Sequence, residues 1–85
     1  MNLTDEIYKR LAVLEPLSVE IHDETIRHAS HAESAAANLI LIIVSSHFSG
    51  KTRIMRHRDI YQLLGDLIPF RIHALSIQAF APDEL

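Results

Sequence analysis

The 85-residue chain predicts one small α+β domain built on a three-stranded mixed sheet with helices packed on one face. Three observations lead to this prediction: two stretches alternate apolar and polar residues, one is a run of aliphatic residues rich in β-branching, and two more repeat apolar residues at helical spacing. The predicted element order is α-β-β-α-β-α. The length allows a single modest core, so residues 1–85 are expected to form one domain.

The chain is expected to open with a helix followed by a strand. Thr4 is expected to cap the helix ahead of acidic residues in its first turn, Ile7 and Leu11 share one helical face, and Pro16 ends the helix. Residues 17–24 then alternate, which is typical of a strand with one face in water.

A second strand and a long helix follow the polar loop at residues 25–37. Residues 38–46 are apolar on both faces, as in a central strand covered on both sides. After a turn at Gly50, apolar residues recur at helical spacing as far as Pro69. The first two strands are expected to pair antiparallel through their loop, and the strand-helix-strand unit favours parallel pairing of the last two.

The last predicted strand covers residues 71–80. Its alternation places Ile72 and Ala74 on one face and His73 on the other. Pro82 is expected to open a final short turn.

The composition excludes several classes of function. With no cysteine, any metal must be held by histidine or carboxylate. The longest apolar run, residues 39–44, is too short to span a bilayer, and the acidic N-terminus has no secretory segment, which predicts a soluble cytoplasmic protein without a membrane partner. No phosphate-binding loop, nucleophile elbow or zinc-protease motif is present, so no enzyme is predicted.

Three histidines are candidate metal ligands. His28 and His31 lie in the polar loop, and His73 opens the last strand, so all three could meet if the loop folds over the sheet edge. The alternative is that they are two solvated loop histidines and one hydrogen-bonded histidine.

A basic segment opens the long helix. It holds half of the lysines and arginines of a chain whose net charge is −3, and its members are Lys51, Arg53, Arg56, His57 and Arg58. It could be a solvated face, a patch for an acidic partner or a surface that contacts phosphates. Each cation at a helix start interacts unfavourably with the helix dipole, at a cost of a few tenths to ~1 kcal/mol. An anionic partner would offset this cost. The negative net charge argues against general nucleic-acid binding.

Three stretches together resemble the BolA-like proteins, in order and with matching gaps, from about residue 19 to residue 85. They read VEIHDETIRH, FSGKTRIMRHRDIYQLL and IHALSIQAFAPDEL. The resemblance implies a fold similar to a class II KH domain. It also implies a protein that pairs with a monothiol glutaredoxin and shares a 2Fe-2S cluster with it and with glutathione. The N-terminus without a targeting segment favours a bacterial cytoplasmic protein, and the chain alone is expected to be a monomer.

By the same resemblance, His73 is the ligand from the strand and His28 or His31 is the ligand from the loop. Imidazole in place of thiolate raises a cluster's potential and makes ligation sensitive to pH. A second role reported for the family is DNA binding with transcriptional control, in which Lys51 to Arg58 would supply phosphate contacts.

Overall fold

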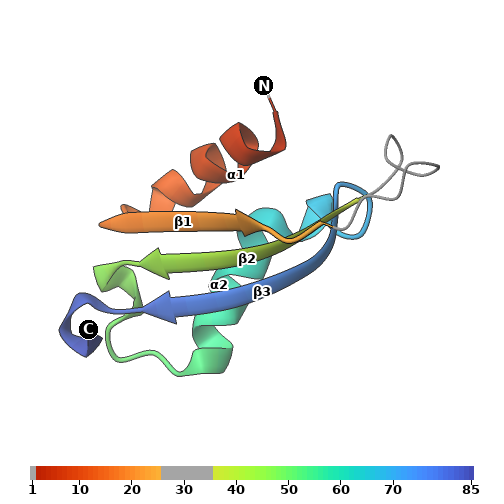
Figure 1. Cartoon of the computed structure of the whole chain (residues 1–85). Helices are drawn as coiled ribbons and strands as arrows, with labels where there is room; N and C mark the ends of the chain where they lie inside the picture. The colour runs from red at the N-terminus through yellow and green to blue at the C-terminus, as the bar shows by residue number, and fades with distance from the viewer. Residues whose placement is uncertain (1, 26–35) are drawn as a thin grey trace.

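Three strands form one mixed sheet in the computed structural model, which describes residues 2–25 and 36–85 (Figure 1). β1 (Ser18–Asp23) runs antiparallel to the central strand β2 (Ala37–Val44), and β2 runs parallel to β3 (Ile72–Phe80). The predicted three-stranded mixed sheet and both predicted pairings are confirmed.

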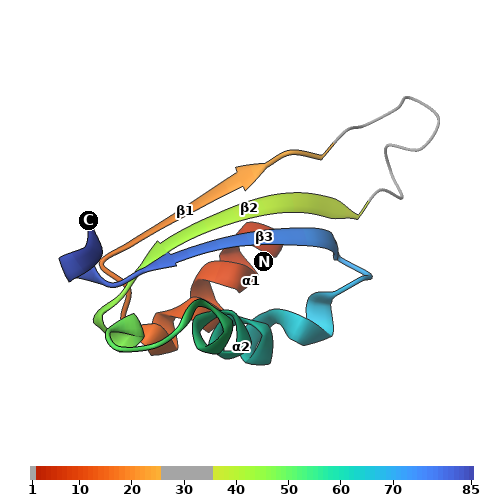
Figure 2. The ribbon, with the colours of Figure 1, turned by 90° about the horizontal axis from the view of Figure 1, so that it is seen from below.

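Two helices pack on one face of this sheet (Figure 2). α1 (Leu3–Leu11) continues as the short 3-10 turn η1 (Ala12–Leu14), and α2 (Arg53–Leu64) continues as η4 (Gly65–Leu67). Two further 3-10 turns follow β2 and β3. They are η3 (Ser46–Phe48) and η5 (Pro82–Glu84), the second at the predicted final turn. Within the described part of the chain, no helix has the length and apolarity that a bilayer crossing requires.

The start of α1 differs from the prediction. The side chain of Asn2 accepts a hydrogen bond of 2.8 Å from the Asp5 backbone N–H, so Asn2 is the cap and Thr4 already lies inside the helix. Asparagine ranks at least as high as threonine as a capping residue, which accounts for the earlier start. The helical backbone ends before Pro16, because Glu15 takes a left-handed conformation with φ 47°.

The core lies between the helices and one sheet face. Its largest fully buried side chains come from both helices, β2, η3 and β3: Ile7, Leu11, Leu41, Ile43, Phe48, Ile60, Leu64 and Ile72. The other sheet face has no helix over it in the described residues (Figure 2). On that face Ile40 and Ile42 of β2 are only half-buried, so the expectation that β2 is covered on both sides is wrong.

A bulge interrupts the pairing of β2 with β3. Ala37 pairs with Ile72, but the next residue, Asn38, pairs with Ala74, which leaves His73 as an extra residue. A bulge of this kind shifts the alternation by one position. Ile72 is therefore fully buried on the helix side, and the prediction that it shares a face with Ala74 is wrong.

Candidate metal and partner sites on the third strand

His73 is a predicted metal ligand that the structure describes, whereas His28 and His31 lie outside the described residues. Its side chain is exposed at the bulge that opens β3. It makes no hydrogen bond or ion pair with any described residue. Both imidazole nitrogens therefore remain open to a ligand or a partner.

The chain on either side of residues 26–35 is fixed at the same end of the sheet as His73. The Glu24 N–H donates to the Asn38 carbonyl at 2.7 Å, and the Asn38 N–H donates to Thr25 Oγ1 at 2.9 Å. Thr25 is held in turn by Asp23, whose carboxylate accepts its N–H at 2.9 Å and also its hydroxyl. Because Asn38 pairs with Ala74, the segment with the two loop histidines ends at the strand next to His73, and it starts after β1, one strand further away.

Asn38 also brings an unpaired polar atom to this end of the sheet. Its side-chain Oδ1 is buried and has no hydrogen-bond partner among the described residues. A buried acceptor without a partner costs about 1–3 kcal/mol. Unsatisfied polar groups of this kind are expected at functional sites, where function is kept at a cost in stability.

Among the described residues, this end of the sheet offers His73 as a single candidate metal ligand. Within residues 2–25 and 36–85, no group of three or more histidines and carboxylates is placed to hold a metal ion. An exposed, unpaired imidazole such as His73 is a suitable single ligand. A metal with three or more protein ligands at His73 would therefore need ligands from outside the described residues.

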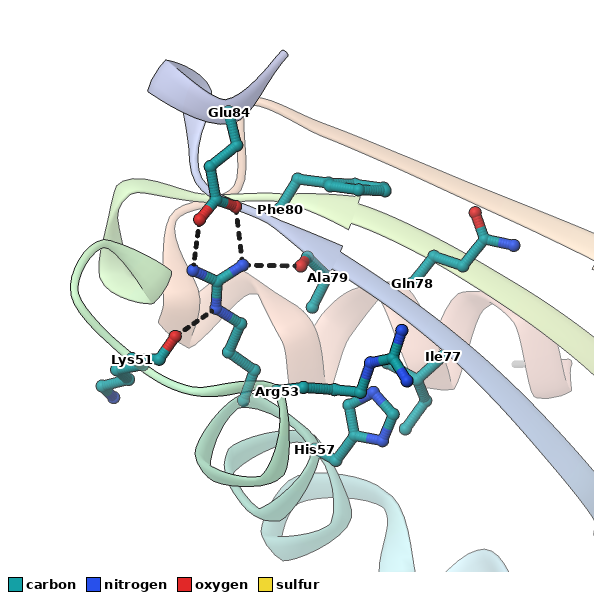
Figure 3. A pocket seen from close by; sticks show the side chains of 9 residues that line it. Lys51, Arg53, His57, Ile77, Gln78, Ala79, Phe80 and Glu84 are labelled. Atoms are coloured by element: carbon teal, nitrogen blue, oxygen red, sulfur yellow. Dashed lines mark hydrogen bonds and ion pairs between the residues drawn. The ribbon is translucent and has the colours of Figure 1, made fainter.

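The basic segment lies toward the other end of β3. Lys51, Arg53, Arg56 and His57 line a pocket of about 720 Å³ together with the last residues of β3 and Glu84, and we call it the α2–β3 pocket (Figure 3). His73 and Ala79 are six residues apart, which is ~20 Å along an extended strand. The structure therefore does not bring the basic segment together with His73.

Arg56 acts inside the molecule. Its guanidinium donates two hydrogen bonds of 2.6 Å to the Glu84 carboxylate, and further bonds of 2.9 Å to the carbonyls of Ala79 and Lys51 (Figure 3). These bonds connect α2, β3 and η5. The prediction that Arg56 contacts a partner or a phosphate stays untested, and four of its five N–H donors already bond within the chain.

The pair between Arg56 and Glu84 shifts the acidity of both groups. Hydrogen bonds from Arg56, and then from the Ala81 N–H, lower the pKa of Glu84 to about 2, and the bond to Glu84 raises the pKa of Arg56. Sequence reasoning missed Glu84 as a member of this pocket. The residues are 28 positions apart, and no local pattern indicates that they meet.

The remaining members of the basic segment divide into paired and free groups. Lys51 Nζ donates to Asp59 Oδ2 at 2.6 Å. Arg53 and Arg58 are exposed and have no ion pair with the described residues, and the half-buried His57 has no hydrogen bond to them. Arg53 and His57 extend from α2 toward Ile77 (Figure 3). The free positive charge of the pocket therefore comes from Arg53.

Comparison with known proteins places the chain in a family. A family model described as BolA-like protein matches residues 11–84. The chain belongs to the BolA-like protein family. This BolA-like chain is 31% identical to the DNA-binding transcriptional regulator BolA of Escherichia coli, over 99% of the chain and 80% of the relative. It is 36% identical over its full length to SufE-like protein 1 of Arabidopsis thaliana, of which it spans only 24%.

Solved BolA structures agree with the fold. BolA1 from Arabidopsis thaliana superposes with a TM-score of 0.88 at 29% identity and covers 100% of this chain and 97% of its own. The BolA domain of SufE1 from the same plant superposes with a TM-score of 0.80 at 37% identity, with coverage of 100% and 99%. The predicted family and the α+β fold with a three-stranded mixed sheet are confirmed, and the last predicted helix is the 3-10 turn η5 in the described residues. The likeness to a class II KH domain and the roles of the individual site residues stay predictions.

Proposed function

We propose that this BolA-like chain is a non-enzymatic adaptor that pairs with a monothiol glutaredoxin and shares a 2Fe-2S cluster with it. His73 and one of His28 or His31 are its ligands. The observation that carries the proposal is the exposed, unpaired His73 at a bulge, at the sheet end where residues 26–35 start and end.

The donor set suits a shared cluster. A chain without cysteine offers imidazole, so thiolate ligands come from the glutaredoxin and glutathione. A bound cluster would supply one-electron chemistry or be passed to another protein. This chain's part is to present a neutral imidazole at residue 73, and a ligand histidine must lose its proton before it binds.

The test is joint reconstitution with a monothiol glutaredoxin, glutathione, iron and sulfide. Visible absorption and circular dichroism are recorded against glutaredoxin alone, and the size of the complex is measured by size-exclusion chromatography. We expect a one-to-one complex with a changed spectrum. An unchanged glutaredoxin spectrum would count against a shared cluster, and a tight complex without iron would identify an interaction domain that holds no metal.

Single variants then assign the ligands. His73→Ala should remove the altered spectrum, and His28→Ala and His31→Ala should show which loop histidine contributes. The matched control is His47→Ala, because His47 is also exposed but follows the opposite end of β2. If His73→Ala and His47→Ala both keep the altered spectrum, His73 is not a ligand.

A second candidate function is DNA binding. Relatives from Escherichia coli and Haemophilus influenzae, 31% and 34% identical, carry the name DNA-binding transcriptional regulator BolA. In this chain the ion pairs of Lys51 and Arg56 leave Arg53 and Arg58 as the free cations of the basic segment. Each phosphate contact contributes about −0.9 to the slope of log K against the logarithm of the salt concentration. Phosphate contacts from Arg53 and Arg58 therefore predict a slope of about −2 on duplex DNA.

The two candidates respond to different variants. Charge reversal of Arg53 and Arg58 should abolish duplex binding without changing the cluster spectrum, and His73→Ala should do the opposite. The absence of any salt-dependent shift of duplex DNA at low ionic strength would rule out the second candidate.

A further inference from the structure

The outer edge of β3 carries backbone groups that no described strand pairs with. The sheet order is β1-β2-β3, so β3 has a neighbour on one side only. In a parallel pair, both the N–H and the C=O of one residue face the same neighbour, and the next residue faces the opposite way. Which residues of β3 face outward therefore decides what the free edge can bind.

Two hydrogen bonds show toward which side the backbone N–H and C=O groups of each β3 residue point. The Phe80 carbonyl accepts from the Ser45 N–H at 2.9 Å, so Phe80 faces the side of β2. The Ala79 carbonyl accepts from the Arg56 guanidinium at 2.9 Å, so Ala79 faces outward. The register is regular from Ala74 to Phe80, and Leu75 and Ile77 therefore also face outward.

The α2–β3 pocket runs beside this edge. Ile77 and Ala79 form its strand side, and Arg53 and His57 of α2 form its helix side (Figure 3). The pair between Arg56 and Glu84 closes the end next to Ala79 by occupying that carbonyl. A free strand edge with a pocket along it is the arrangement in which proteins bind an extended peptide as an added strand.

We propose that an extended acidic peptide from a partner protein adds to the sheet along Leu75 to Ala79 and fills the α2–β3 pocket. The charges decide the kind of occupant. Lys51 and Arg56 are neutralised by Asp59 and Glu84, which leaves the Arg53 guanidinium as the free charge that lines the pocket. A carboxylate in the added strand would pair with it.

The same charges disfavour two other occupants. A second copy of this chain that paired edge to edge would bring two Arg53 side chains toward one another. Nucleic acid needs several free cations along its phosphates, and the described lining of the pocket offers one free arginine. The α2–β3 pocket lies toward the opposite end of β3 from His73, and the proposed added strand begins two residues after His73, at Leu75.

Hydrogen exchange on the unmodified protein tests the backbone pairing. Two-dimensional NMR follows the amides of Leu75 and Ile77, with and without a short peptide of alternating valine and glutamate. Because both amides face outward, they should exchange rapidly in the free protein and slow by about tenfold or more when most of the protein is bound. The Ser76 and Gln78 amides, which face β2, should not change. Unchanged exchange at Leu75 and Ile77 with saturating peptide would overturn the proposal.

Two charge reversals on the same helix test the pocket. Arg53→Glu should weaken the acidic peptide about fivefold, as expected for the loss of one exposed ion pair and its replacement by repulsion. Arg58→Glu is the matched control, because Arg58 is also exposed and unpaired but does not line the pocket, and it should change the affinity by less than about twofold. Equal weakening by both variants would indicate general attraction between opposite charges and would overturn the pocket assignment.

Two further ligands separate the remaining explanations. A peptide of alternating valine and lysine should bind more weakly than the glutamate peptide, and equal binding would remove the role of Arg53. Protection of Leu75 and Ile77 by a short single-stranded DNA but not by the acidic peptide would make the groove a nucleic-acid site. Slow exchange without any ligand, together with a dimer in sedimentation, would make it a self-association site.

Discussion

Replacing Ser45 by alanine removes one oxygen atom and is expected to lower the free energy of unfolding by about 1.5–5 kcal/mol. The hydroxyl is fully buried, donates to the Leu14 carbonyl at 2.6 Å and accepts from the His47 N–H at 3.1 Å. An unpaired buried carbonyl costs about 1–3 kcal/mol, and the loss of a capping oxygen about 0.5–2 kcal/mol. This hydroxyl connects the end of η1 to the end of β2, which is why so small a change is expected to matter.

The assay is urea unfolding followed by far-ultraviolet circular dichroism on Ser45→Ala and Ser46→Ala. Ser46 is the neighbouring residue, but it is exposed and its side chain makes no hydrogen bond with the described residues, so its variant should stay within about 0.5 kcal/mol of the parent. Equal losses in the two variants, or a loss below about 1 kcal/mol in Ser45→Ala, would refute the reasoning.

Three more predictions address other positions. Asn38→Val should raise the unfolding free energy by about 1–2 kcal/mol in the same assay, because it removes a buried acceptor without a described partner and adds a β-branched residue; a loss would show that the oxygen is satisfied. Gly50→Ala, at φ 78°, should lower it by about 1 kcal/mol, and Gly65→Ala, at φ −60°, should raise it by up to about 1 kcal/mol; neither added Cβ has an atom within 4 Å, and changes of the same sign would contradict this account. Because the pKa of Glu84 is lowered to about 2 by Arg56, the stability from this carboxylate is fully present above about pH 4.5 and is lost as the pH falls toward 2. In melting temperatures measured against pH, Glu84→Gln should therefore flatten the acid limb, and equal steepness would count against the pair.

The sheet was predictable because its signals are local. The alternation of residues 17–24 and the aliphatic run at 38–46 each mark a strand from its own residues. The strand-helix-strand connection then allows few topologies, and the structure has the predicted pairings. The start of helix α1 was missed, because Asn2 and Thr4, two residues apart, both offer a capping side chain.

The features that define the candidate sites depend on contacts between distant residues. The bulge at His73 reverses the predicted face of Ile72, and it arises from the pairing with β2 rather than from any turn signal in β3. In the sequence, Arg56 cannot be distinguished from its basic neighbours. In the structure its ion pair with Glu84 compensates its positive charge, so Arg56 does not count among the free cations. His73 and the basic segment could thus be predicted from the sequence, whereas which basic side chains are free depends on contacts between distant residues.

The bulge at the start of β3 places His73 between a residue that anchors the strand in the core and a residue that pairs with β2. Ile72 anchors β3 in the core and Ala74 resumes pairing with Asn38, so His73 between them has no packing role. Position 73 can therefore change during evolution or by design with little cost to folding. A substitution such as His73→Cys should alter which metals or partners this end of the sheet accepts while the rest of the molecule keeps its stability. The side chain at position 73 can therefore be exchanged while the fold of β3 stays the same.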